Sequence, residues 1–235
     1  MKQDKKTAVA AQAKPQSLAA QAYEAIKERI ITLHFLPGQY VNEADIASLL
    51  QFGRTPVHQA LQRLDHEGLV QVLPRKGIII RPDSLQEILR ILDSRITVEP
   101  ELARQAAQSA TKEQAKTLVD LAAATPPSKD APDIATFTTN DRAFHRAIGE
   151  VSGNAVMADF ARMLHERSTR FWYLHLWQTI NVAQSNAEHL KVAKAIAAGK
   201  GDAAAERMAE HIEGLRTRLK NLPGGVFGTP PRPKS

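Results

Sequence analysis

Four side chains in the C-terminal half of the chain have the types and the spacing that bind a metal ion. Asp141 and His145 lie four residues apart in a helical pattern, so both project from one face, about 6 Å apart along the helix axis. His189 and His211 are each 11 residues from Lys200, the middle residue of a Gly-Lys-Gly turn. In an antiparallel helical hairpin both would lie about 16 Å from that turn, and therefore level with one another.

One carboxylate and three imidazoles suit Zn²⁺, Ni²⁺, Mn²⁺ or Fe²⁺. The chain has no cysteine, which excludes disulfides, thiolate zinc fingers and a cysteine nucleophile. Such an ion could also activate water, so a metal-dependent enzyme is an alternative. Against it, no nearby carboxylate has the spacing of a general base, and we expect no enzyme activity. Taken singly, each histidine is more typical of a core or a surface than of a metal site.

Two other histidines of this half are not assigned to the metal. His165 and His175 are ten residues apart on one predicted helix, and at about 100° per residue their side chains point in nearly opposite directions. The aromatic residues between Phe171 and Trp177 are more typical of a core or a dimer contact than of a ligand pocket.

The elements that must position these residues are helices, and everything after Pro82 is predicted to be helical. Ser84 followed by Glu87 is a capping-box signature that opens the first of them. Breaks rich in Gly and Pro separate the others. The predicted helices are residues 84–109, 112–124, 134–151, 155–180, 183–198 and 203–222. The sequence therefore predicts an antiparallel bundle of about six helices.

The N-terminal third begins with three shorter helices. An apolar stripe at three- and four-residue spacing predicts a helix from Leu18 to Leu33. Asn42 is placed to cap a second helix, and Thr55 with Pro56 after it is placed to cap a third. Gly68 is placed to end that third helix.

A hairpin of two short strands, residues 69–73 and 78–81, is predicted after the third helix, with a cationic turn at 74–77. Two short helices and a hairpin form a winged helix-turn-helix, whose second helix can enter the major groove of DNA. The alternative is that its polar face is merely solvated. Outward residues suited to phosphates and base edges are Arg54, Thr55, His58, Gln59, Gln62 and Arg63 on the helix, and Arg75 and Lys76 at the wing tip.

The composition, with 43% hydrophobic and 24% charged residues, is that of a folded protein. No apolar stretch is long enough for a membrane span and no secretory signal is present, so we expect a cytoplasmic protein with no membrane partner. The net charge is +6. Half of it lies in residues 1–17, which with residues 223–235 are predicted to be disordered tails. Residues 18–82 carry seven Lys and Arg against six Asp and Glu, so DNA binding rests on where the cations stand.

The motifs of the N-terminal third are Asn42 to Ala47, Gly53 to Leu64, Glu67 to Val70 and Pro74 to Gly77. Together they closely resemble the winged helix-turn-helix of the GntR family of bacterial transcription regulators. The resemblance implies DNA contacts at Arg54, Thr55, His58, Arg63, Lys76 and Gly77. Gly53 stands where the family usually has Ser or Thr, and His58-Gln59 where it usually has Arg-Glu. Because His58 lacks the guanidinium fork, we expect the operator sequence read at this point to differ from the family norm.

Residues 84–222 resemble the ligand-binding domain of the fatty-acid-regulator branch of that family, and six helices resemble its vanillate-regulator subgroup. The resemblance implies zinc-type ligands at Asp141, His145, His189 and His211. Arg95 to Pro100 is similar to the domain's Arg-x-x-Leu-Glu-Pro signature, with Val98 in place of Leu. Arg95 is therefore a candidate to hold an effector carboxylate through its guanidinium. The alternative is an ordinary exposed arginine paired with Glu99 one turn on.

These observations predict a mainly α protein with a winged helix-turn-helix domain at residues 18–82 and an effector-binding and dimerisation domain at 83–222. We expect a homodimeric repressor that binds double-stranded operator DNA and is released by a small organic acid bound at a divalent metal, with Zn²⁺ the first choice. Besides the enzyme, the alternative is a constitutive DNA-binding protein with a structural metal.

Overall fold

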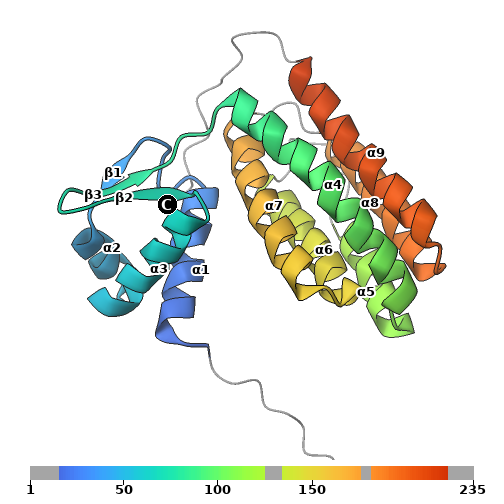
Figure 1. The fold of residues 1–235 in the computed structure, drawn as a ribbon, viewed down its shortest axis with the longest axis horizontal. Helices are drawn as coiled ribbons and strands as arrows, with labels where there is room; N and C mark the ends of the chain where they lie inside the picture. The colour runs from blue at the N-terminus through green and yellow to red at the C-terminus, as the bar shows by residue number, and fades with distance from the viewer. Residues whose placement is uncertain (1–15, 125–133, 176–180, 222–235) are drawn as a thin grey trace, which may run out of the picture.

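The computed structural model describes residues 16–124, 134–175 and 181–221. Within these ranges it has nine helices and one three-stranded sheet (Figure 1). We call residues 16–82 the head and the helices that follow the bundle. Most of both predicted tails, and the Pro-rich break at 126–132, lie outside the described residues. None of the described helices has the length and apolar character needed to cross a membrane.

The head is a winged helix-turn-helix, as predicted. Its sheet has the order β1-β3-β2 with both pairings antiparallel. Apolar residues of α1 and α3, including Ile26, Leu61 and Leu64, pack with Ile78 of the sheet to form its core. The elements are α1 (Leu18–Ile31), β1 (Tyr40–Val41), α2 (Glu43–Leu50), α3 (Arg54–His66), β2 (Val70–Leu73) and β3 (Gly77–Ile80).

Two details of the head differ from the sequence prediction. Helix α3 is capped by Gly53 rather than by Thr55, so Pro56 lies at its third position and not at its first. A proline is tolerated there because the first N–H groups of a helix have no partner within it. Strand β1 was not predicted, since its two residues carry no periodic signal. The caps at Asn42 and the left-handed Gly68 are confirmed.

The bundle has the six helices that the sequence predicts. Helix α4 packs against α6, α7, α8 and α9, and Figure 1 shows it running along the bundle between α7 and α9. Ser84 caps α4 by accepting the backbone N–H of Glu87, while the Glu87 carboxylate contacts Arg167 instead of returning to the cap. The helices are α4 (Leu85–Ser109), α5 (Lys112–Ala123), α6 (Ile134–Ser152), α7 (Ala155–His175), α8 (Val182–Ala197) and α9 (Gly201–Lys220).

Helix α7 joins the bundle to the head through buried ion pairs. Lys27 of α1 lies 2.9 Å from the carboxylate of Glu166, and only 2% and 7% of the two side chains are exposed. Arg170, one turn on, makes two hydrogen bonds to Asp83 in the connection between the parts, at 2.5 and 2.7 Å. Its guanidinium also reaches the carbonyl oxygen of Leu69 at 3.4 Å. The same helix therefore belongs to the bundle core and to the contact with the head.

Candidate metal centre, effector cavity and DNA interface

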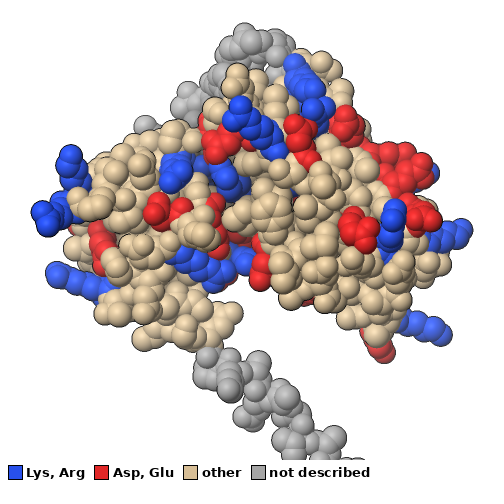
Figure 2. All heavy atoms as spheres, viewed as in Figure 1, with Lys and Arg blue, Asp and Glu red and all other residues tan. Residues whose placement is uncertain are grey.

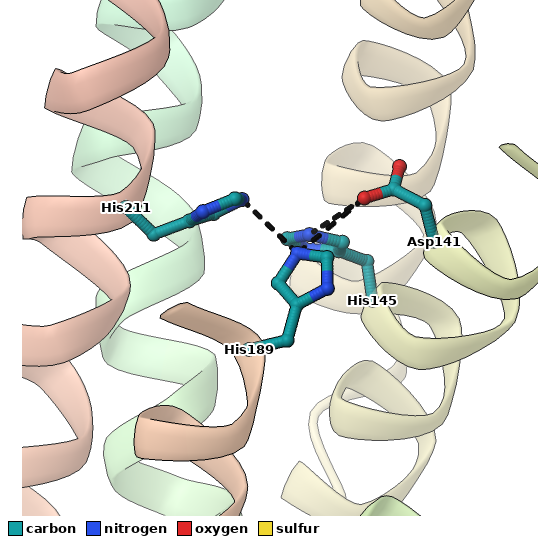
Figure 3. A group of neighbouring side chains, drawn as sticks. All are labelled: Asp141, His145, His189 and His211. Atoms are coloured by element: carbon teal, nitrogen blue, oxygen red, sulfur yellow. Dashed lines mark hydrogen bonds and ion pairs between the residues drawn. The ribbon is translucent and has the colours of Figure 1, made fainter. Parts of the chain in front are cut away.

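The four predicted metal ligands meet inside the bundle, from three helices (Figure 3). Asp141 and His145 stand one turn apart on α6, and His189 of α8 lies level with His211 of α9. Their candidate ligand atoms all lie within 4.8 Å of one another. The i,i+4 pair of α6 and the level pair of α8 and α9 thus meet in one place.

The residues fit a divalent cation. Ligands about 2.0–2.2 Å from an ion in tetrahedral or octahedral geometry lie about 3.0–3.5 Å from one another. The Nε2 atoms of His189 and His211 are 3.2 Å apart, and the Asp141 carboxylate lies 3.4 Å from Nε2 of His189. Nε2 of His145 is 3.9 Å from the same carboxylate. It is also buried without a hydrogen-bond partner, which is unusual for a buried nitrogen unless it serves as a ligand.

Two of the imidazoles are oriented by carboxylates on their other nitrogen. Nδ1 of His145 lies 2.6 Å from Oε2 of Glu99, and Nδ1 of His211 lies 2.8 Å from Oε2 of Glu188. A histidine held in this way donates from Nδ1 and leaves the Nε2 lone pair free for a metal.

His165 is the residue that the sequence reasoning missed. It is not one of the four, but its Nε2 lies 3.0 Å from the second carboxylate oxygen of Asp141. Asp141 and His165 are each twelve residues from Gly153, the turn between α6 and α7. Equal distances from the turn of a helical hairpin, which bring His189 level with His211, therefore also bring Asp141 level with His165. The side chain of His175 lies outside the described residues.

Burial sets the charge state of the cluster. It lowers the pKa of His189 well below its ordinary value, aided by His211, and lowers that of His211. Burial, with Arg95 and His145 nearby, lowers the pKa of His165 to about 4. Burial alone would raise the pKa of Asp141, but contact with the histidines, His165 above all, holds it well below its usual range. At neutral pH His189 and His211 are therefore neutral imidazoles and Asp141 is a carboxylate, the forms that bind metals.

A cavity of about 320 Å³ lies beside the cluster, with Asp141 and His211 in its wall. Part of its lining is apolar, from Phe137, Trp172 and Leu215. Polar and charged groups line the rest, among them the Thr169 hydroxyl, the Asn181 amide and the Arg218 guanidinium. A cavity that combines an apolar wall with polar groups is typical of small-molecule sites.

Arg95 stands at the edge of this cavity and is 2% exposed. Its guanidinium donates to both carboxylate oxygens of Glu99, at 2.5 and 3.2 Å, and to the hydroxyl of Ser168 at 2.8 Å. The alternative weighed from the sequence is therefore right about the pairing with Glu99 and wrong about exposure, because Arg95 is buried. Three of its five N–H groups are used, so two are left that an effector carboxylate could accept.

The predicted DNA contacts fall into two groups. Arg54, Thr55, His58 and Gln59 are exposed on the N-terminal half of α3, and Arg75 and Lys76 are exposed at the turn between β2 and β3. Figure 2 shows Lys and Arg side chains gathered at the outer end of the head, where this turn lies. Gly77 has a φ of +123°, and a Cβ there would lie 2.5 Å from the Tyr40 hydroxyl, so the wing requires glycine.

Arg63 lies apart from these residues. Its guanidinium stacks 3.7 Å from the ring centre of Tyr23, and its Nε donates to Glu67 at 3.0 Å. It lines a cleft between the head and the bundle together with Arg142 and Arg146 of α6. Contact between Arg63 and DNA remains a prediction that no feature of this cleft supports.

A winged helix-turn-helix joined to a helical domain with an internal cavity is typical of a DNA-binding transcription regulator. Residues 18–80 match the gntR family of bacterial regulatory proteins, and residues 90–214 match the FCD domain. The chain therefore belongs to the GntR family of regulators, in the branch that carries the FCD domain. The family resemblance drawn from the sequence is confirmed.

Relatives and solved structures agree with this assignment. The chain is 35% identical to an HTH-type regulator in the TAR-I ttuE-ttuC′ intergenic region of Agrobacterium vitis, over 54% of this chain and 76% of that one. It is 28% identical to the Nta operon transcriptional regulator of Aminobacter aminovorans, over 78% and 85%. Among solved structures, E. coli McbR/YncC has the same fold, with a TM-score of 0.71 at 18% identity over 88% of this chain and 98% of that one.

Proposed function

We propose that this transcription regulator binds operator DNA through its head and is controlled by a small organic acid held at a divalent metal in the bundle. The observation that carries the proposal is the meeting of Asp141, His145, His189 and His211 in one cluster, with Asp141 and His211 in the wall of a 320 Å³ cavity. A cluster in an apolar core with no opening would suit a structural metal. A cluster beside a cavity suits a ligand that touches the metal.

Asp141, His145, His189 and His211 would hold the ion, with Zn²⁺ favoured and Ni²⁺, Mn²⁺ or Fe²⁺ possible on the same donors. When bound, the ion supplies a positive charge and open positions for an anionic ligand. Arg95 and Arg218, which also line the cavity, add guanidinium groups suited to carboxylates. The apolar wall suits a carbon skeleton, so the effector class is a small organic acid.

Helix α7 is the element best placed to carry the effector signal to the DNA. Thr169 and Trp172 line the cavity, and His165 contacts Asp141. On the same helix, Glu166 pairs with Lys27 of the head and Arg170 with the connection. A small displacement of α7 on ligand binding would therefore move the head. We propose a homodimer, because two heads that change their separation would lose two half-sites together.

We propose that the chain is a repressor released by its effector, as the sequence analysis expects. One relative that is 21% identical over 88% of this chain, RspR of E. coli, is named a transcriptional repressor. The constitutive alternative predicts that no small molecule alters DNA affinity, and the enzyme alternative predicts turnover of a substrate. Both are therefore open to the same set of measurements.

The test is fluorescence anisotropy on labelled DNA from upstream of the gene, with Zn²⁺-loaded protein and with tartrate, citrate, glucuronate and benzoate as probes. We expect at least one acid to weaken DNA binding by the wild type and to lose that effect in His189→Ala. Elemental analysis should find one divalent ion per chain. Retained metal with DNA affinity that no acid alters would refute the effector mechanism, and turnover that requires His189 would favour the enzyme.

A further inference from the structure

Glu99 contacts the candidate ligand His145 on the side of the ring that faces away from the cluster. It is a helix α4 residue, 3% exposed, and its Oε2 lies 2.6 Å from Nδ1 of His145. The opposite nitrogen of His145, Nε2, is the buried atom without a partner that faces the cluster. The contact with Glu99 thus fixes both the rotation of the ring and the nitrogen that is left for a ligand role.

A carboxylate in this position is costly unless it is compensated. The compensation is Arg95, one turn earlier on α4, which donates two hydrogen bonds to Glu99. The third hydrogen bond from Arg95 reaches Ser168 of α7. Ser168, Arg95, Glu99 and His145 therefore form one continuous chain from α7 through α4 to α6.

The same arrangement occurs a second time at the cluster. Nδ1 of His211 lies 2.8 Å from Glu188, and Arg218 lies 3.7 Å from the other oxygen of that carboxylate. An ion pair does not require a histidine as a third member, and the Nδ1 of a buried histidine can donate to a backbone carbonyl instead of a carboxylate. Two copies of guanidinium, carboxylate and imidazole in the same order, around one cluster, indicate a shared purpose.

We propose that Glu99 is a positioning residue that holds His145 with Nε2 directed at the metal, and that Arg95 maintains Glu99 for this task. This inference rests on the proposed metal site. It gives Arg95 and Glu99 of α4 a role in positioning the metal ligand His145, in addition to the place of Arg95 in the cavity wall. An effector carboxylate that draws on Arg95 would then act on a ligand of the metal through Glu99.

The test compares three variants of the full-length protein by Zn²⁺ titration against a chromophoric chelator and by the visible absorption of bound Co²⁺. Glu99→Gln should bind Zn²⁺ about 10–100-fold more weakly than the wild type, the usual loss when such a partner is removed. Its Co²⁺ spectrum should also change. The control is Glu101→Gln on the same helix, where the side chain is 41% exposed and pairs with Arg104; it should behave as the wild type.

The third variant, Glu99→Asp, separates positioning from a structural ion pair and covers the case in which Glu99→Gln fails to fold. Aspartate keeps the negative charge for Arg95 but is one methylene too short to reach His145. The Glu99→Asp variant should fold, and its Zn²⁺ affinity should be lower than that of the wild type. Wild-type affinity and an unchanged Co²⁺ spectrum in Glu99→Asp would overturn the inference. A wild type that binds no metal would instead refute the proposed metal site.

Discussion

The head and the bundle differ in what they bury. Among the described residues, the buried side chains of the head are hydrophobic, with Lys27 as the one charged exception, and Lys27 faces α7. The interior of the bundle holds Arg95, Glu99 and three histidines: His189 and His211 of the cluster, and His165 beside it. Burying polar groups costs free energy unless they are paired. The head therefore works through its surface and the bundle through its interior.

The largest expected effect concerns the boundary between the two. Arg170→Met leaves Asp83 without its partner, and the two side chains are 0% and 1% exposed. Loss of one member of a buried pair costs about 3–5 kcal/mol of unfolding free energy, to be measured by urea denaturation. The control is Arg207→Met, which breaks an exposed pair with Glu210 and should change little. Equal losses of unfolding free energy in the two variants would show that the buried pair contributes no more to stability than the exposed one.

A smaller effect tests whether the head is an independent apolar core. Leu64→Ala truncates a side chain that is fully buried between α1 and α3. The expected cost is about 2–5 kcal/mol, seen as loss of DNA binding and early melting of the head. Zn²⁺ binding by the bundle should persist at the wild-type affinity. If it falls in parallel, the head and the bundle unfold as one unit and the contrast between them fails.

Sequence reasoning reached the features that local rules govern. Helical periodicity predicted the helices, and cap chemistry predicted Asn42 and Ser84 as their starts. Equal distances from Lys200 brought His189 level with His211, because a helical hairpin fixes that relation once its turn is known. The role of these residues as metal ligands stays a proposal, but their convergence did not require the fold.

The features that sequence reasoning missed depend on contacts between distant residues. Glu99 and Glu188 carry no spacing signal toward the imidazoles they hold, which lie 46 and 23 residues away. The pair of Lys27 and Glu166 spans 139 residues. Each of these is decided by packing and not by a local preference.

Zn²⁺ bound in the bundle should stabilise the folded protein. Zn²⁺ at about 100 times its dissociation constant should raise the unfolding free energy by about 2.7 kcal/mol, measured by denaturation with and without the ion. His189→Ala removes a buried candidate ligand atom and should abolish the increase. His66→Ala, at an exposed histidine of the head, should keep it. An increase that survives in His189→Ala would place the bound ion elsewhere.

The smallest expected effect on stability comes with a clear effect on function. Arg54→Ala removes an exposed cation from the first position of α3, so the unfolding free energy should stay within about 0.5 kcal/mol of the wild type. If Arg54 contacts a phosphate, DNA binding should weaken on any duplex, and its dependence on log salt should fall by about one unit. The matched control is Lys116→Ala, which removes an exposed cation from the bundle. A purely long-range effect of charge would weaken DNA binding in both variants alike. Equal losses of DNA affinity would therefore contradict the proposal that the head reads the DNA. A loss of affinity confined to Arg54→Ala would place the contact on α3.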